Sequence, residues 1–512
     1  MSLEKNLLPQ NLQGFKIHFV GIKGTGMAAL VEICYARGAV ITGSDVPERF
    51  YTDAILEKLN IKPFTSFSAQ NVADDVQLVI YSSAYKLDQN PDLIEARKKN
   101  IPILLYTQAL GEISALTYSC GGAGGRGKTT TTGLVGTLIK SLNLPAQVLA
   151  GSIISSFDDK CTLNNGNDFF VAETCEYQRH FMAFHPQKII LTSVESDHED
   201  YYPTYESIRD AFVDYAKLLP AGGQLIYCAD EAGACEVAEI IEKQRPDVVL
   251  IPYGVTAKGD YQLTVGKIED GKQYFRIAAF DGDFYLKVPG IHLLRNATAA
   301  CALACELLKT SAQQKASAIP GMTETFLCLK NGFASFCGAK RRSEIISMLK
   351  APAKKAVQYE KNLQNLQNVK NKGILVMDDY AHHPTAIKTT LEGLRLFYPD
   401  RRIIVDFMSH TYSRTAALLD QFAASFSAAD VVILHKIYPS AREKYDGTVN
   451  GKVLFEKTKE NHKNVVYYEE ILDALPYVKE ILQDGDLFIT MGAGDNWKIG
   501  KAIVDDFEKL EN

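Results

Sequence analysis

One short stretch of the sequence limits the possible folds more than any other: residues 122–129 read Gly-Ala-Gly-Gly-Arg-Gly-Lys-Thr. The stretch matches the pattern G-x-x-x-x-G-K-[ST] and lies between a predicted strand at 116–119 and a predicted helix that runs to about residue 142. In that setting backbone N–H groups cradle phosphates, the lysine neutralises β- and γ-oxygens, and the threonine hydroxyl can bind Mg²⁺. The sequence therefore predicts a nucleoside triphosphate site, against the alternative of a chance glycine-rich turn.

Predicted strands and helices alternate along the whole chain, in three blocks. This alternation is typical of parallel sheets that helices cover on both faces. At roughly 150 residues per domain, a chain of 512 residues suggests about three domains. We predict an α/β protein with domains at residues 1–113, 114–336 and 337–512. Two stretches depart from the alternation: 261–287 is expected to form antiparallel strands at the edge of the central sheet, and 351–372 an exposed insertion.

The composition excludes several classes of protein. Hydrophobic residues make up 46% and charged residues 23%, which is ordinary for globular domains. The net charge of −6 leaves no basic excess for binding nucleic acid. No run approaches the ~18 apolar residues of a membrane span, and no apolar signal segment precedes a cleavage site. The scattered cysteines, without C-x-x-C, indicate reduced thiols. We therefore expect a cytoplasmic protein with no nucleic-acid or membrane partner.

A second glycine turn follows the predicted strand at 16–20. Gly21, Gly24 and Gly26 let backbone N–H groups approach a phosphate at a helix N-terminus. Asp45 follows about 20 residues on, at the end of the next strand, where a ribose or base contact is expected. The spacing is not G-x-G-x-x-G, so a phosphate-bearing ligand and a purely structural turn both stay open. A dinucleotide dehydrogenase is also possible at this point.

Acidic residues follow two strands of the second block. Glu173 comes after the predicted strand at 169–171, where the strand end would place it beside the triphosphate turn. His198 follows the predicted strand at 189–192, among further acids. Mg²⁺ prefers oxygen ligands, so spacing alone leaves His198 open as a ligand or as a hydrogen-bonding loop residue.

The motifs taken together resemble the Mur ligases, the ATP-dependent amide-forming enzymes of peptidoglycan assembly, and among them the branch that adds alanine. The resemblance covers nearly the whole chain in the family's order, and its most specific parts are Asp-Tyr-Ala-His-His-Pro and the ending Gly-Ala-Gly-Asp. The matching segments are 18–27, 43–45, 127–131, 172–177, 195–198, 289–292, 296–300, 338–342, 378–385, 410–415 and 492–495.

This resemblance implies a three-domain architecture: a Rossmann-like N-terminal domain that binds a UDP-sugar, a central P-loop ATPase-type domain, and a Rossmann-like C-terminal domain that brings the amino acid. It implies that the lactoyl carboxylate of UDP-N-acetylmuramate attacks the γ-phosphate of ATP, that ADP leaves an acyl phosphate, and that L-alanine then forms the amide. Mg²⁺ is implied beside ATP, and a monomer or homodimer is expected. The resemblance also implies that the first glycine turn binds the UDP diphosphate. A dinucleotide dehydrogenase then becomes the less favoured interpretation.

Two alternatives stay open within this resemblance. The ligase that attaches a recovered tripeptide to UDP-N-acetylmuramate shares the motifs, but the ending Met491–Asp495 argues against it. A non-catalytic, nucleotide-binding regulatory protein is the other alternative. The intact Lys128, Thr129 and Glu173 argue against that one.

The resemblance also carries roles to single residues. Catalysis is expected from Lys128, Glu173, His198, Arg342 and His382, and metal binding from Thr129, Glu173 and His198. ATP is expected at Gly124, Gly127, Lys128, Thr129, Thr130, Asn296, Arg342 and Asp379. The UDP-sugar is expected at Gly21, Gly24, Thr25, Gly26, Met27, Asp45 and Ser82. The amino acid is expected at His410 and Arg414.

Some positions depart from the family pattern or stay ambiguous. Gly125-Arg126 stands where the family usually has Thr-His, and Ser343 where an aromatic residue often follows the arginine pair. His383, directly before a proline, is expected to be structural. Arg414 could instead be a surface residue paired with Asp420 or another acid of its helix.

Overall fold

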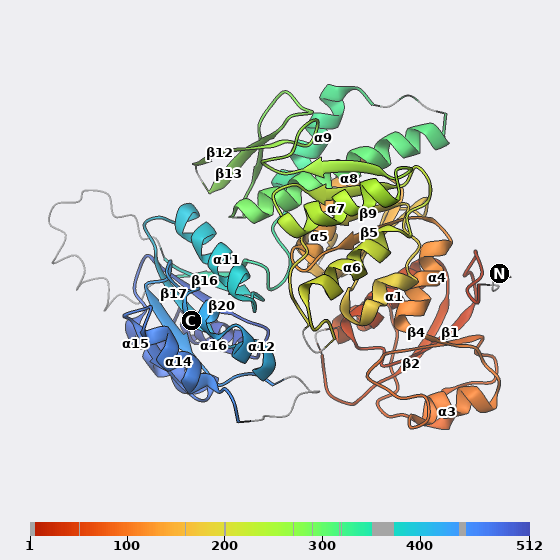
Figure 1. The fold of residues 1–512 in the computed structure, drawn as a ribbon. Helices are drawn as coiled ribbons and strands as arrows, with labels where there is room; N and C mark the ends of the chain where they lie inside the picture. Colours follow the sequence, from red (N-terminus) through yellow and green to blue (C-terminus); the bar gives the residue numbers. More distant parts are fainter. Residues whose placement is uncertain are drawn as a thin grey trace. The chain divides into compact units, whose positions relative to one another are not determined.

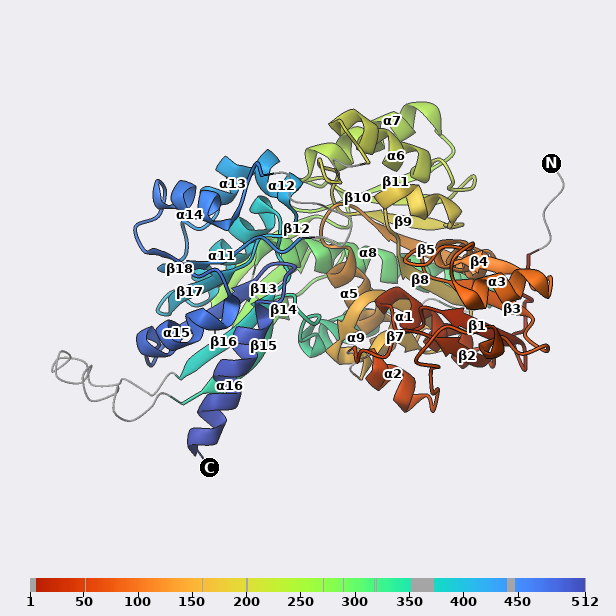
Figure 2. The ribbon, with the colours of Figure 1, turned by 90° about the horizontal axis from the view of Figure 1, so that it is seen from below.

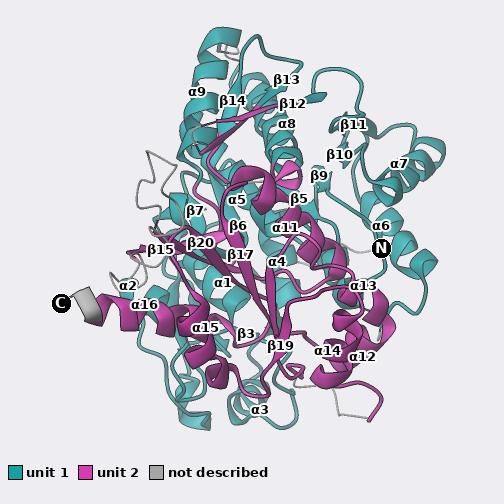
Figure 3. Cartoon of the chain, turned by 90° about the vertical axis from the view of Figure 1, so that its left-hand side faces the viewer, with its two compact units in different colours: residues 1–265, 275–285, 294–336 teal, residues 266–274, 286–293, 337–512 magenta. Residues whose placement is uncertain are grey.

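The structure is a computed structural model. It describes residues 6–50, 52–158, 160–198, 201–269, 271–288, 290–316, 318, 320–350, 373–439 and 447–511. The predicted insertion at 351–372 lies outside these residues. The chain divides into two compact units, which Figure 3 distinguishes by colour: unit 1 comprises residues 1–265, 275–285 and 294–336, and unit 2 comprises 266–274, 286–293 and 337–512.

The first sheet of unit 1 has four parallel strands in the order β2-β1-β3-β4. Because the carboxyl ends of parallel strands meet at one edge, the turns that follow β1, β3 and β4 lie along the same edge. The strands are β1 (Lys16–Val20), β2 (Val40–Ser44), β3 (Leu78–Tyr81) and β4 (Ile103–Leu105); the helices after them are α1 (Thr25–Ala36), α2 (Asp53–Lys58), α3 (Pro91–Lys98) and α4 (Tyr106–Ala115).

The second sheet of unit 1 has the order β11-β10-β9-β5-β8-β6-β7, and all its strands are parallel except β7, which runs antiparallel to β6. Helix α1 of the first sheet packs against β6 and β7, so the two sheets share a helical layer. The strands are β5 (Tyr118–Ala123), β6 (Ala146–Ile154), β7 (Lys160–Asn164), β8 (Phe169–Glu173), β9 (Lys188–Leu191), β10 (Gln224–Cys228) and β11 (Val249–Tyr253).

Helices cover this second sheet, as the alternating pattern predicts. Helices α6 and α7 pack against each other (Figure 1), and they lie beside β10 and β11 (Figure 2). Helix α5 packs against β6, β8 and α9. The helices are α5 (Lys128–Ser141), α6 (Tyr205–Ala216), α7 (Ala232–Gln244), α8 (Ile291–Gln314) and α9 (Met322–Ser335).

The strands expected at 261–287 form a sheet of their own. They are β12 (Leu263–Glu269), β13 (Lys272–Ile277) and β14 (Phe284–Leu286). The prediction of strands is confirmed, but their placement at the edge of the central sheet is wrong. The alternation of side chains identifies a strand, whereas the choice of its hydrogen-bonding partner depends on packing that is distant in sequence.

Helix α8 is long and apolar enough to cross a membrane, by length and composition alone, and 83% of its apolar window is buried inside the protein. Burial of this kind is typical of a core helix. All ten cysteines are free, as the scattered spacing predicts.

Unit 2 contains a six-stranded sheet in the order β15-β16-β20-β17-β18-β19, parallel except for β15. Alternate residues of β16 enter different cores: Leu375 and Met377 pack with α11, and Val376 packs with α16. The strands are β15 (Glu344–Leu349), β16 (Ile374–Asp379), β17 (Arg402–Phe407), β18 (Val431–Leu434), β19 (Val465–Tyr467) and β20 (Asp486–Met491). The helices are α11 (Pro384–Phe397), α12 (Tyr412–Ala417), α13 (Leu419–Ala423), α14 (Gly451–Lys459), α15 (Leu475–Ile481) and α16 (Trp497–Glu511).

Candidate active site

The triphosphate turn predicted from the sequence is formed between β5 and α5. Gly124 (φ 136°) and Gly127 (φ 81°) adopt backbone conformations that other residues rarely allow. A Cβ on Gly124 would lie 2.1 Å from the Thr192 hydroxyl oxygen, and a Cβ on Gly127 would lie 2.8 Å from Oδ1 of Asn296. Conformation and space therefore both require glycine here, and the turn presents the first N–H groups of α5 to an anion.

Lys128 is the first residue of α5, and its ammonium group is held inside the turn. Its Nζ donates to the carbonyl oxygen of Gly124 and to Glu176 Oε1 and Oε2, at 3.0 and 2.8 Å from these two. Burial works to lower the pKa of Lys128, but the neighbouring carboxylates, Glu176 above all, outweigh burial and raise it. Burial works to raise the pKa of Glu176, but Lys128 outweighs burial and lowers it. The two side chains therefore form a charged pair.

Three ionisable side chains gather beside this lysine. Glu176, Asp197 and His198 offer ligand atoms that all lie within 4.8 Å of one another. Nε2 of His198 is 3.5 Å from Glu176 Oε1 and 3.9 Å from Asp197 Oδ2. His198 has a positive φ of 58°, in the loop that follows β9. Two carboxylates and an imidazole are a donor set that can hold a divalent cation.

Glu173, which the sequence predicts to bind a metal with His198, lies at the end of β8. Its Oε2 accepts a hydrogen bond of 2.8 Å from the N–H of Gly151. Glu173 is close enough to contribute to the raised pKa of Lys128. Glu176 and Asp197 were not assigned from the sequence. An acid three residues after Glu173 and another directly before His198 are the signals that could have found them.

Thr129, Thr130 and Asn296 are buried around the same turn. The two threonines follow Lys128 in the first turn of α5, and Asn296 reaches the turn from α8, where its amide lies against Gly127. Asn296 is therefore not a polar residue remote from the site. The predicted hydrogen bonding of the Asn296 amide to adenine stays a prediction.

Arg126, which departs from the family pattern, points toward acids. It pairs with Glu195, and its second contact is Glu231, at 3.8 Å. Arg295 approaches the same Glu231 at 3.4 Å and also bonds Asp230 at 2.7 Å. The guanidinium of Arg126 is thus held by carboxylates in the loops that follow β9 and β10.

The first glycine turn lies between β1 and α1, and two tyrosines cover it. A Cβ on Gly21 (φ 85°) would lie 2.7 Å from Cε2 of Tyr85. A Cβ on Gly26 would lie 2.8 Å from Cζ and 2.9 Å from the hydroxyl oxygen of Tyr106. Ser82 directly follows β3, and its Cβ would lie 3.0 Å from a Cβ on Gly21. The predicted residues Thr25 and Met27 lie on either side of Gly26, in the first turn of α1.

Asp45 is buried beneath this first turn. It accepts hydrogen bonds from the N–H of Lys23 at 2.7 Å, from its neighbour Val46 at 2.8 Å and from the hydroxyl of Tyr85 at 3.0 Å. Both carboxylate oxygens therefore bond the protein and hold the turn in shape. The predicted contact of Asp45 with a ribose or base stays a prediction.

In unit 2, Arg341 and Arg342 share one loop but have different surroundings. Arg341 bonds Asp378 at 2.7 Å and the carbonyl oxygen of Gly492 at 2.9 Å. The guanidinium of Arg342 lies 5.0 Å from the ring centre of Tyr380. With the residues that the structure describes, the Arg342 side chain makes no hydrogen bond or ion pair. Arg342 is therefore available for an anion in a way that Arg341 is not.

Asp379 is buried at the end of β16, where it organises the same loop. Its Oδ2 accepts from the N–H and the hydroxyl of Ser343, at 2.6 and 3.1 Å, and its Oδ1 accepts from the N–H of Ala381 at 2.8 Å. Burial raises the pKa of Asp379, although Arg342 works in the opposite direction. Its predicted contact with the ATP ribose stays a prediction.

His382 and His410 lie in the loops that follow β16 and β17, and Arg414 lies in α12, directly after the second of these loops. The rings of His382 and His410 are 6.3 Å apart, and His382 Nδ1 lies 3.0 Å from the carbonyl oxygen of Tyr380. His383 caps α11 by accepting from the N–H of Thr385, so its predicted structural role is confirmed.

Arg414 lies in α12 and is only 8% exposed. The alternative of a surface arginine is therefore wrong. Asp420, its suggested partner, lies 3.3 Å from Lys457.

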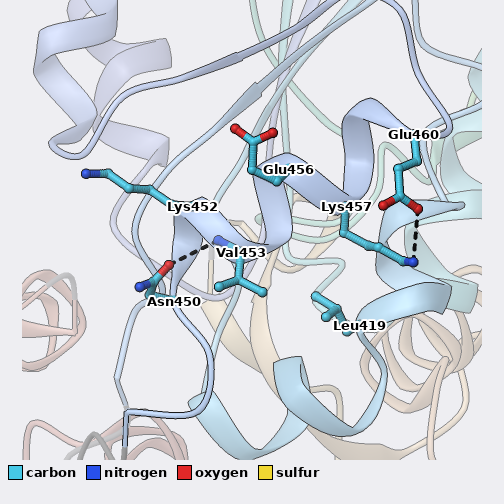
Figure 4. A pocket seen from close by; sticks show the side chains of 7 residues that line it. All are labelled: Leu419, Asn450, Lys452, Val453, Glu456, Lys457 and Glu460. Atoms are coloured by element: carbon cyan, nitrogen blue, oxygen red, sulfur yellow. Dashed lines mark hydrogen bonds and ion pairs between the residues drawn. The ribbon is translucent and has the colours of Figure 1, made fainter.

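Figure 4 shows a pocket that Lys457 helps to line, and none of the predicted site residues lines it. Its lining residues are Leu419, Asn450, Lys452, Val453, Glu456, Lys457 and Glu460.

The fold and the two glycine turns define an α/β protein of the nucleotide-binding class, with a P-loop in its central sheet. Comparison with known families goes further. Family models match at residues 16–118 (Mur ligase family, catalytic domain), 123–304 (Mur ligase middle domain) and 364–494 (Mur ligase, glutamate ligase domain). The chain belongs to the Mur ligase family, and its architecture comprises the three domains of that family.

Curated relatives and solved structures agree with this assignment. A UDP-N-acetylmuramate–L-alanine ligase of Treponema pallidum is 49% identical over 99% of this chain and 100% of the relative, and one of Borrelia garinii is 36% identical over 94% and 97%. The crystal structure of the UDP-N-acetylmuramate–alanine ligase of Thermotoga maritima matches with a TM-score of 0.70 at 24% identity, covering 97% of this chain and 99% of that one. The murein peptide ligase of Psychrobacter arcticus matches with a TM-score of 0.60 at 20% identity, over 96% and 99%. At these identities the structural matches show the fold alone.

Proposed function

We propose that this chain joins L-alanine to the lactoyl carboxylate of UDP-N-acetylmuramate, with ATP converted to ADP and phosphate, in the synthesis of peptidoglycan precursors. The observation that carries the proposal is the P-loop lysine Lys128, buried in a glycine turn beside Glu176 and His198. The full-length similarity to curated L-alanine ligases supports the choice of substrates.

The chemistry explains why such a site is needed. A carboxylate is a poor acylating group, so the lactoyl carboxylate first attacks the γ-phosphate of ATP, and an acyl phosphate forms as ADP leaves. The amine of alanine then attacks the activated carbonyl, and phosphate departs. Two anions meet in the first step, so fixed cations and N–H donors must offset their repulsion. Lys128 and the backbone of Gly124 and Gly127 are suited to do this.

A divalent cation fits the residues present. Mg²⁺ prefers oxygen ligands, and Thr129, Glu173, Glu176 and Asp197 supply oxygens near Lys128, with His198 as a nitrogen ligand. When bound, Mg²⁺ would screen the phosphate charge. We retain Thr129, Glu173 and His198 as the proposed ligands and add Glu176 and Asp197 as candidates.

The other residues are proposed for binding and positioning. Asn296 would read adenine, since an amide offers a paired donor and acceptor. Arg342 would contact the γ-phosphate, and Asp379 the ribose. His382 would hydrogen-bond the reacting groups. The UDP-sugar would bind at Gly21, Gly24, Thr25, Gly26, Met27, Asp45 and Ser82, and the alanine carboxylate at His410 and Arg414.

We further propose domain limits of 1–113, 114–336 and 337–512 and a cytoplasmic location. The expected partners are the small-molecule substrates, without nucleic acid or membrane, and the expected state is a monomer or homodimer.

Mass analysis of the product tests the activity. The chain is incubated with ATP, Mg²⁺, UDP-N-acetylmuramate and each of the 20 amino acids in turn. We expect a product heavier by one alanine residue and phosphate release only when the sugar nucleotide and alanine are both present. A parallel incubation offers the tripeptide in place of an amino acid, and ligation of the tripeptide but not of alanine would assign the chain to cell-wall recycling. Nucleotide binding without any product would indicate a non-catalytic regulator.

A further inference from the structure

The two tyrosines over the first glycine turn differ in what their hydroxyl groups do. Tyr85 lies over Gly21, and its hydroxyl donates to Asp45 at 3.0 Å. Tyr106 lies over Gly26 with the hydroxyl-bearing end of its ring, since Cζ and the hydroxyl oxygen would lie 2.8 and 2.9 Å from a Cβ on Gly26. Among the residues that the structure describes, the Tyr106 hydroxyl has no hydrogen-bond partner. The hydroxyl of Tyr85 therefore stabilises the turn, whereas the hydroxyl of Tyr106 is a donor at the surface of the turn without a partner among the described residues.

The position of Tyr106 follows from the topology of the first sheet. Tyr106 is the first residue of α4 and comes directly after β4, at the carboxyl edge where β1 also ends. Gly26 lies in the first turn of α1. The Tyr106 hydroxyl is thus held at the N-terminal turn of a twelve-residue helix, whose unpaired N–H groups favour an anion.

The surroundings keep this hydroxyl protonated. Burial raises the pKa of Tyr106, and the nearby Glu173 and Cys175 raise it further. A neutral phenol is an O–H donor, and a donor in partly buried surroundings bonds a charged acceptor strongly. Because Glu173 belongs to the central sheet, Tyr106 lies within electrostatic reach of both the first glycine turn and the acids near the triphosphate turn.

We propose that Tyr106 is a binding residue for the sugar nucleotide, and that its hydroxyl donates a hydrogen bond to an anionic oxygen of UDP-N-acetylmuramate. The acceptor is an oxygen of the diphosphate at α1 or of the lactoyl carboxylate. The proposal rests on the proposed function for the identity of the ligand. It rests on the contact with Gly26 and the unpaired hydroxyl for the role of the residue.

Titration calorimetry of Tyr106→Phe tests the proposal, because the substitution removes the donor and keeps the ring over Gly26. We expect the Kd for UDP-N-acetylmuramate to rise about tenfold or more, the usual effect of losing a hydrogen bond to a charged group. ATP affinity should stay within about twofold, which also shows that the variant is folded. The matched control is Tyr227→Phe, which removes a hydroxyl from β10 that has no hydrogen bond with the described residues, and which should bind like the wild type.

Shorter ligands distinguish the two acceptors. If UDP and UDP-N-acetylglucosamine, which lack the lactoyl group, lose as much affinity as UDP-N-acetylmuramate, the acceptor is the diphosphate. If only UDP-N-acetylmuramate loses affinity, the acceptor is the carboxylate. If Tyr106→Phe binds all three ligands like the wild type, the proposal is overturned while the proposed function stands. A wild-type protein that binds none of them would instead overturn both.

Discussion

The two glycine turns of unit 1 share a strand–turn–helix plan but differ in the groups they offer to an anion. At the first turn, the Nζ of Lys23 donates to the carbonyl oxygens of Val46 and Glu48, at 3.0 and 2.9 Å, and forms an ion pair with Asp53 at 3.3 Å. At the second turn, Lys128 occupies the turn itself and is paired with Glu176. Both ammonium groups are thus bonded within the protein, but only that of Lys128 lies inside the turn itself, whereas the first turn offers neutral N–H and O–H donors.

This difference matches what each turn is proposed to hold. A diphosphate that is only bound keeps its charge throughout the reaction, so neutral donors and a helix N-terminus suffice. A phosphoryl group that is transferred develops charge on its oxygens in the transition state, and a fixed cation stabilises that charge. The two proposed phosphate sites of the protein would thus differ in chemistry, although both are strand–turn–helix units.

Removing the lysine of each turn should produce the largest difference between the two turns. Lys128→Ala should lower ligation about a thousandfold or more, because the transferred phosphoryl loses its cation. The same variant should bind UDP-N-acetylmuramate within about twofold of the wild type. Steady-state kinetics and calorimetry measure the two effects.

Lys23→Ala is the matched variant at the first turn. The variant should have a lower melting temperature, because loss of the buried ammonium group leaves its acceptor oxygens without a donor. Its kcat should stay within about tenfold of the wild type. A Lys128 variant that is folded but has lost its sugar nucleotide affinity would contradict the separation of the two sites. A Lys23 variant with normal stability and no catalysis would reverse the comparison.

The neighbouring arginines of unit 2 extend the test to a second cation. Arg342→Ala should lower kcat about a hundredfold with little change in melting temperature, because its guanidinium makes no hydrogen bond or ion pair with the described residues and acts on Asp379 only through its charge. Arg341→Ala should instead lower the free energy of unfolding by about 1–3 kcal/mol, since it leaves Oδ2 of the buried Asp378 without its cationic partner, while Oδ1 keeps the hydrogen bond from Thr490. Equal effects of the two variants on stability and kcat would argue against a role for Arg342 at the γ-phosphate.

A third anion, the carboxylate of alanine, is expected at Arg414. Alanine has only a methyl side chain, so most of its binding energy must come from its charged ends. Arg414→Ala should raise the KM for alanine about 30-fold and leave the KM values for ATP and the sugar nucleotide within a few-fold. Arg414→Lys should restore only part of the loss, because an ammonium group cannot make the paired contact.

The control for Arg414 is Lys457→Ala, which removes an exposed ion pair with Asp420 and should leave every KM unchanged. An Arg414→Ala variant with a normal KM for alanine would show that Arg414 is not the carboxylate anchor.

The local parts of both sites could be predicted from the sequence. The turn at Gly124–Thr129 is fixed by residues within one strand–turn–helix unit, so its motif identifies it directly. The alanine-adding branch, which followed from motifs spread along the chain, is confirmed by the curated relatives. The structural role of His383 could also be predicted, because a side-chain cap acts on the next residues of its own chain segment.

Contacts between distant segments could not be predicted in the same way. Glu176 lies 48 residues from Lys128, and only the parallel pairing of β5 with β8 brings the two together. The sequence offered Glu173 and Glu176 three residues apart, without showing which of them bonds the lysine. For Asp45 the position after a strand, and for Asp379 the family resemblance, predicted an acid that contacts a ligand, but not that the neighbouring backbone would occupy its oxygens.

The smallest expected effect concerns the pH dependence of the Lys128–Glu176 pair in the ligand-free protein. Because the pKa of Glu176 is lowered on folding, the pair stabilises the protein above the ordinary carboxyl pKa of about 4.3, and this stabilisation is lost as the pH falls through the lowered value. Glu176→Gln should therefore cost about 2 kcal/mol at pH 7 and less at pH 4, measured as the gap in melting temperature from the wild type. Glu195→Gln gives the opposite trend, because burial raises the pKa of Glu195 although Arg126 opposes this, so the wild type gains stability over that variant as the pH falls. If the difference in melting temperature between the wild type and Glu176→Gln stays constant with pH, the ionised carboxylate of Glu176 does not stabilise the charge of Lys128. The difference between the two turns would then depend on Lys128 without Glu176.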